Sequence, residues 1–135
     1  MDITGKWKIK EFRILSPDGM QTFTPQTLPD SEDFEDFAKM IPMLIEFTPD
    51  GKLNTLVPVW GDMIEEARNA GLTVREAGFA VTDSTDWKES DGKFYYNTNI
   101  EGEFLGDVVD PFSEIKVTED GCLLYSFDML LMERA

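Results

Sequence analysis

The dipeptide Asp-Gly occurs four times in this 135-residue chain, each time between stretches that are rich in strand-forming residues. Asp-Gly favours tight β-hairpins, because both residues tolerate positive φ and the resulting turn matches the twist of the flanking strands. Four hairpins predict about eight antiparallel strands. The turns are SPDGM at 16–20, TPDGK at 48–52, ESDGK at 89–93 and TEDGC at 118–122.

The first predicted strand changes phase. Trp7 and Ile9 stand at odd positions, whereas Phe12 and Ile14 stand at even ones, which predicts a bulge near Lys10. Bulges bend strands, as closure into a barrel requires. At the other end of the chain, the segment CLLYSFDMLLM has a period of two, and one face of a single strand would carry Leu123, Tyr125, Phe127, Met129 and Leu131.

Two short helices are predicted between the hairpins. Residues 31–41 would begin at Ser31 as the cap, end before Pro42 and carry an apolar stripe of Phe34, Phe37, Ala38 and Ile41. Residues 61–70 would begin at Asp62 as the cap, with Gly71 as the stop and Ile64 and Ala67 on one face.

The expected architecture is an antiparallel up-and-down β-barrel with both helices at one rim, because a closed meander leaves no exposed sheet edge. All four Asp-Gly turns are then expected at the opposite end. The stretch 72–85 is an additional strand or an extension of the fifth, so nine or ten strands remain open. Residues 1–135 form one domain of mainly β class.

The amino-acid composition limits the classes of molecule that this protein is expected to bind. The net charge of −15 repels nucleic acid and anionic membrane surfaces, and it favours a basic protein partner if there is a protein partner at all. The single cysteine, Cys122, excludes an internal disulfide, and together with the absence of an export signal it favours the cytoplasm. No apolar stretch reaches the roughly 20 residues of a membrane-spanning helix.

Closure of the barrel would pair the first and last strands antiparallel. Trp7 would then lie near Arg134, the natural cation for the indole face. Gly5-Lys6-Trp7 resembles the G-x-W signature on the first strand of lipocalins and other calycin barrels, in which an arginine near the last strand packs across the tryptophan. The resemblance implies a lipocalin-like barrel over residues 1–135, with Gly5, Trp7 and Arg134 as its structural signature.

The chain is also similar to fatty-acid-binding proteins, through its GKWK opening and through SEDFEDFAKMI, which resembles their helical lid. It differs from them by the hairpin between these two features. It differs from secreted lipocalins by its lack of an export signal and of disulfides. The broad superfamily is therefore assigned and the subfamily is not.

Catalytic and metal-binding signatures are missing from the sequence. It has no histidine, so Cys122 has no such base to activate it, and DSEDFEDF lacks the glycine and the spacing of an EF-hand loop. We expect neither an enzyme nor a cofactor or metal site.

Two functions remain. The first is binding of a small, largely apolar molecule in the barrel interior, without conversion. The second is a packed barrel that acts as a protein interaction or scaffold domain. For the first, Tyr96, Tyr125 and Arg75 are expected to point inward, and the mouth would be bordered by Phe34, Phe37, Trp60 and Ile64.

Overall fold

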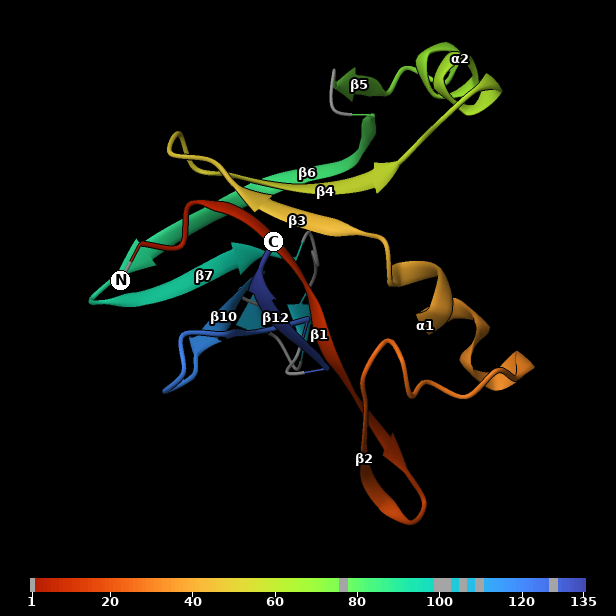
Figure 1. Ribbon diagram of the computed structural model, residues 1–135. Helices are drawn as coiled ribbons and strands as arrows, with labels where there is room; N and C mark the ends of the chain where they lie inside the picture. Colours follow the sequence, from red (N-terminus) through yellow and green to blue (C-terminus); the bar gives the residue numbers. More distant parts are fainter. Residues whose placement is uncertain (1, 76–77, 99–102, 105–106, 109–110, 127–128) are drawn as a thin grey trace.

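The computed structural model describes residues 2–75, 78–98, 103–104, 107–108, 111–126 and 129–135 (Figure 1). It is a closed antiparallel β-barrel of eight strands, in which the last strand pairs with the first. The strands of the barrel wall, in chain order, are β1 (Gly5–Ser16), β3 (Leu44–Phe47), β4 (Lys52–Pro58), β6 (Phe79–Ser90), β7 (Lys93–Asn97), β10 (Phe112–Val117), β11 (Leu123–Tyr125) and β12 (Leu130–Arg134).

Four further strands lie outside this wall. β2 (Gly19–Phe23) extends the sheet beyond β1, and β5 (Thr73–Arg75) pairs with the beginning of β6. β8 (Glu103–Phe104) and β9 (Asp107–Val108) pair with each other in a separate sheet. Residues 72–85 thus contain an additional short strand and also the start of the long strand β6, so both of the open alternatives occur.

The barrel closes between β1 and β12, and the register shifts between Ile9 and Glu11. This confirms the bulge predicted near Lys10. The extra residue lets Trp7, Ile9 and Phe12 all face the core, although they differ in sequence parity, and all three are buried.

Three of the four Asp-Gly turns connect neighbouring barrel strands at one end. In the third, Asp91 and Gly92 both have positive φ, at 53° and 79°, as a two-residue hairpin requires. The second and fourth are built alike: the amide of Thr48 donates to Lys52 O at 2.8 Å, and that of Thr118 donates to Cys122 O at 2.9 Å.

The first Asp-Gly turn lies at the opposite end, which corrects the prediction that all four share one end. Gly5 at the start of β1 pairs with Phe47, next to the second turn, so the end of β1 must lie at the helical rim. β2 pairs only with the far half of β1, where Ser16 faces Gly19 across Pro17–Asp18. The β1–β2 hairpin therefore projects from the wall as an arm (Figure 1).

The last segment also differs from its prediction. Residues 123–134 form two strands rather than one, because Ser126 adopts a positive φ of 56° and β12 folds back on β11. The core-facing residues of β12 are therefore Leu130 and Met132, whereas Met129 is exposed. Phe127 lies outside the described residues. The predicted number of eight wall strands is correct. The wall includes β12, however, whereas β2, the second strand of the first predicted hairpin, lies outside it.

The helical elements are η1 (Glu32–Phe34), α1 (Glu35–Met40) and α2 (Asp62–Asn69). α1 leads into β3 and α2 follows β4, and Leu44 pairs with Leu56, so both helices lie at one rim as predicted. Neither predicted cap forms: Ser31 precedes η1 without a side-chain bond, and Gly61 stands before α2. No helix among the described residues is long and apolar enough to cross a bilayer.

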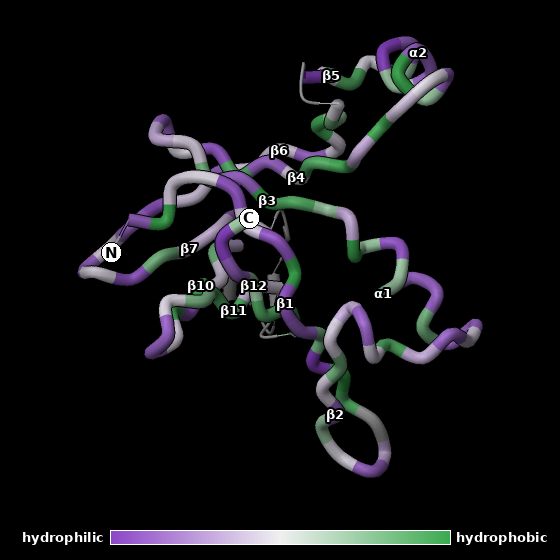
Figure 2. The backbone as a smooth tube through the Cα atoms, viewed as in Figure 1, coloured by the Kyte–Doolittle hydropathy of each residue, from purple (hydrophilic) through white to green (hydrophobic). Residues whose placement is uncertain are grey.

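The hydrophobic core fills the inside of the barrel. Hydrophilic and hydrophobic residues follow one another at short intervals along the wall strands (Figure 2), as expected where one face is buried. The central cluster holds thirteen buried side chains: Ile3, Trp7, Ile9, Phe12, Ile45, Phe47, Leu53, Phe94, Tyr96, Ile115, Leu123, Leu130 and Met132.

Candidate functional site

The end of the barrel near the chain termini is sealed by Trp7. Its side chain is fully buried, and its indole Nε1 donates to the carbonyl of Ile3 at 2.9 Å. The guanidinium of Arg134 lies over the ring, 4.3 Å from the centroid, and donates to the carbonyls of Thr4, at 2.6 Å, and Asp2. The predicted contact between Arg134 and Trp7 is thus present.

Gly5 lies directly beside the guanidinium of Arg134. Its φ is +116°, and a Cβ at this position would lie 3.0 Å from Nη1 of Arg134. A side chain here would require the guanidinium to shift by a few tenths of an ångström, and this φ is one that residues other than glycine rarely adopt. The three signature residues therefore act together in sealing this end.

Aromatic rings continue from the sealed end along the inside of the barrel. Trp87 contacts Phe47 edge-on at 5.6 Å and Phe94 at 6.3 Å. Further toward the mouth, the rings of Tyr96 and Tyr125 lie 4.8 Å apart. Side chains thus occupy the positions at which an interior ligand was expected.

Tyr96 and Tyr125 are both held neutral. Burial raises the pKa of Tyr96, and its hydrogen bond with Ser113 offsets part of that effect. Burial raises the pKa of Tyr125 further, and the nearby Tyr96 and the carboxylate of Asp83 add to the increase. Both hydroxyls therefore stay protonated at neutral pH and offer hydrogen-bonding groups at the mouth side of the core.

The mouth is covered by α1. The ring of Phe37 packs edge-on against Phe12 at 5.8 Å, and Met40 and Ile41 also pack against the core. One turn earlier, Phe34 contacts Phe23 of β2 at 5.4 Å. Phe37 therefore covers the mouth of the barrel. Phe34 connects the same helical segment to the β1–β2 arm through its contact with Phe23.

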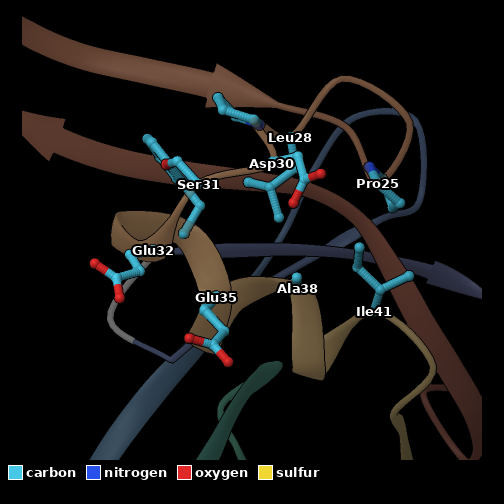
Figure 3. A pocket seen from close by; sticks show the side chains of 10 residues that line it. Pro25, Leu28, Asp30, Ser31, Glu32, Glu35, Ala38 and Ile41 are labelled. Atoms are coloured by element: carbon cyan, nitrogen blue, oxygen red, sulfur yellow. The ribbon is translucent and has the colours of Figure 1, made fainter.

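A groove of about 530 Å³ lies on the outer side of this cover (Figure 3). Its walls are the loop after β2, η1 and α1. Glu32 lies at one end, and Pro25 and Ile41 lie at the other. It is lined by Pro25, Leu28, Pro29, Asp30, Ser31, Glu32, Phe34, Glu35, Ala38 and Ile41, which include three carboxylates and no basic residue.

A second hollow of about 360 Å³ adjoins the groove, since Pro25 and Ile41 line both. It carries Lys8 and Lys10 from β1 together with Glu133. Both lysines form long ion pairs of 3.8 Å, with Glu133 and Asp120 respectively. The surface beside α1 is therefore acidic in the groove, whereas in the second hollow the lysine charges are largely neutralised by ion pairs.

Arg75 does not point into the barrel as expected. Its Nη1 lies 2.6 Å from Oε1 of Glu46, and Glu46 stands between Ile45 and Phe47, which both face the core. Side chains alternate along a strand, so Glu46 and its partner lie on the outer face. The ion pair with Glu46 holds the guanidinium of Arg75 on this outer face. Strand periodicity alone cannot predict such a pair.

The surroundings of Glu46 lower the pKa of its carboxyl. Partial burial alone would raise the pKa of this carboxyl. The hydrogen bonds from Arg75, at 2.7 Å, and from Asn54 Nδ2, at 3.1 Å, outweigh that cost and lower the pKa. The pair anchors β5, and with it the neighbouring α2, to the barrel wall.

The remaining predicted site residues are separated from the groove. Trp60 precedes α2 and is 66% exposed, and Ile64 lies on α2 itself, whereas the groove is formed by the segment around α1. Of the expected ligand-binding residues, only Phe34 lines the groove. The loop residues 25–31 were missed, because a proline-rich stretch without periodicity carries no strand or helix signal.

Among the residues that the structure describes, no group of three or more His, Cys, Asp or Glu side chains is arranged to hold a metal ion. Cys122 is a free thiol and is buried beside the fourth turn.

Comparison with known proteins leaves the fold to be interpreted from the geometry. No family model matches the chain, and neither a curated protein nor a solved structure matches it significantly.

Proposed function

We propose that this protein is a non-catalytic, calycin-like binding protein that holds a small, largely apolar molecule with a positive charge in the groove at the barrel mouth. The observation that carries the proposal is the groove itself. Its volume of about 530 Å³ falls within the range of ligand pockets. Six of its ten lining residues are apolar (Pro25, Leu28, Pro29, Phe34, Ala38 and Ile41).

The packing of the core moves the proposed site from the barrel interior to the mouth. Ligand binding between the two tyrosines would have to separate rings that are 4.8 Å apart and displace buried side chains. Binding in the groove needs no such rearrangement, because its apolar surface already faces solvent. A preformed site avoids the cost of reorganisation.

The expected positive charge of the ligand follows from the acidic residues that line the groove. Asp30, Glu32 and Glu35 border the groove, and the whole chain carries a net charge of −15. This field attracts cations and repels carboxylates. An apolar amine therefore fits the groove better than a fatty acid of the same length.

The test compares decylamine, decanol and decanoate, each below its micellar concentration, by isothermal titration calorimetry. Decylamine should bind with micromolar affinity, and decanoate should bind most weakly. Ala38→Trp should fill the groove and weaken binding at least about tenfold, since loss of the apolar contacts of a short chain is worth more than 1.4 kcal/mol. Ala70→Trp, an exposed position after α2, is the matched control.

Two results would contradict the site. If Ala38→Trp bound decylamine as tightly as Ala70→Trp does, the groove would not be the binding surface. If Tyr125→Trp weakened binding instead, the ligand would occupy the barrel interior. Binding of none of the three probes would reject the binding function.

The packed interior also favours the second function, a barrel that serves as a protein interaction domain. Large apolar side chains stand exposed on the arm, where Leu15 is 77% and Met20 is 61% accessible. A basic protein partner would suit the acidic surface. Native mass spectrometry of freshly purified protein distinguishes the two functions, since an added small mass supports the first and an added chain of a different mass supports the second. The cytoplasmic location stays a prediction.

A further inference from the structure

The β1–β2 arm combines three properties that do not occur together elsewhere among the described strands. It projects from the barrel, one of its two strands has an open edge, and it carries almost no charge. Charged residues make up 29% of the whole chain, yet residues 14–29 contain a single one, Asp18. Any surface on which two copies of so acidic a protein can meet should be sought here.

The open edge is β2. Of the described strands, it pairs with β1 alone, and its three central residues, Met20, Gln21 and Thr22, are exposed. Sheet edges are commonly protected by lysine, proline or a bulge. β2 reads GMQTF and pairs with β1 without a register shift, so none of these protections is present in it.

The backbone direction of β2 can be worked out from its register. The amide of Arg13 donates to Met129 O on the far side of β1, so the neighbouring Ile14 turns its own groups toward β2 and bonds Gln21. Bonded and unbonded positions alternate along an antiparallel pair. Met20 and Thr22 therefore direct their backbone N–H and C=O groups away from β1, toward the open side.

We infer that two copies of this chain pair through β2, antiparallel and around a two-fold axis at Gln21. In this register Met20 of one copy faces Thr22 of the other, and the outward groups of these residues form four backbone hydrogen bonds. The pairing satisfies the same groups in both copies, as an isologous interface requires. It converts two projecting hairpins into one four-stranded ribbon.

The low charge of the arm allows a second copy to approach at this edge. Two barrels of net charge −15 repel each other wherever their walls approach. Antiparallel pairing of the arms holds the barrels at opposite ends of the ribbon. The arm extends four residues beyond Phe12, roughly 13 Å at strand spacing, which exceeds the screening length of about 8 Å in physiological salt. The short interface predicts a weak, concentration-dependent dimer.

Disulfide trapping tests this register. Gln21 would face Gln21 of the second copy at an unbonded position, where Cα atoms lie about 4.5 Å apart and a disulfide can form. Under mild oxidation with glutathione disulfide, Gln21→Cys should give a covalent dimer on non-reducing gels about tenfold faster than Asn69→Cys, an exposed position on α2. The native Cys122 is buried and is common to both variants.

A second variant separates edge pairing from simple exposure. Thr22→Pro, added to Gln21→Cys, removes an outward N–H donor while leaving the hairpin bonds to β1 in place. Crosslinking should then fall to the rate of Asn69→Cys, with an unchanged melting temperature. Equal rates for Gln21→Cys and Asn69→Cys, or undiminished crosslinking in the Thr22→Pro double variant, would overturn the inference. Neither outcome bears on the groove.

Discussion

The two ends of this barrel are both closed by an aromatic ring, but they differ in which parts of the chain hold that ring in place. At the sealed end, Trp7 is fixed by Ile3 and by Arg134, which belong to opposite ends of the sequence. At the mouth, Phe37 is brought onto Phe12 by a short helix within one continuous stretch of chain. One closure depends on the completed barrel and the other on a local segment.

This difference determines which end can open. Arg134 links the two chain ends through hydrogen bonds to main-chain carbonyls as well as through the indole. α1 has no side-chain cap, and its Glu35–Lys39 pair is long and well exposed, so it contributes little. Segments with few such ties open locally at lower free energy than the core. We therefore expect the mouth to open at lower free energy than the sealed end.

Loss of Trp7 should have the largest effect. Trp7→Ala removes a fully buried ring that touches both chain ends and should lower the free energy of unfolding by about 3 to 5 kcal/mol. Urea unfolding monitored by circular dichroism measures the change. Trp60→Ala, at a position that is 66% exposed, is the control and should have little effect. A Trp7→Ala protein as stable as this control would refute the sealed end.

Loss of Phe37 should have a smaller and local effect. Because the ring is only partly buried, Phe37→Ala should cost about 2 kcal/mol, roughly half of a full core truncation. Hydrogen exchange should accelerate across residues 31–41 and remain unchanged in β12. Equal acceleration in both regions would show that the mouth and the sealed end unfold as one unit.

The pair between Glu46 and Arg75 should give the smallest effect, and one that depends on pH. The pKa of Glu46 is lowered in the fold, so its stabilisation is present above the ordinary value of 4.5 and is lost as the pH falls through the folded value. Glu46→Gln should therefore lower the free energy of unfolding by about 1 kcal/mol at pH 7. The difference from the unmodified protein should shrink below pH 4.5.

Glu133→Gln is the matched control, since the pair of Glu133 with Lys8 is long and lies at the surface. A stability difference for Glu46→Gln that stays constant from pH 7 to acid conditions would show that the pair does not anchor β5. β5 would then be held by its pairing with β6 and by packing.

The sequence predicted the barrel through signals that act locally. Asp91-Gly92 needs only its own two positive φ values to make a turn, and the phase change around Lys10 needs only neighbouring side chains. The contact of Trp7 with Arg134 was predicted because closure of a meander pairs its first and last strands, and through the resemblance of GKW to a known signature.

Errors arose where the tertiary partner decided the outcome. β2 has the pattern of a wall strand, but β3 and β12 already pair with the first half of β1, so β2 can pair only with the remaining half. In the same way, the period of two in residues 123–131 continues through a reversal at Ser126 that alternation cannot detect. The groove was missed because its loop residues are positioned by their neighbours rather than by a repeat.

The pairing of β1 with β12 also imposes an order in time. Hairpins such as β3–β4 and β6–β7 join residues close in sequence and can form as soon as they leave the ribosome, whereas Trp7 must wait for Arg134, more than a hundred residues later. Until then, the backbone groups of β1 that will pair with β12 have no strand partner, and the indole of Trp7 is not covered by Arg134. Nascent chains that stall before residue 130 should therefore be recognised by chaperones that bind exposed hydrophobic strands.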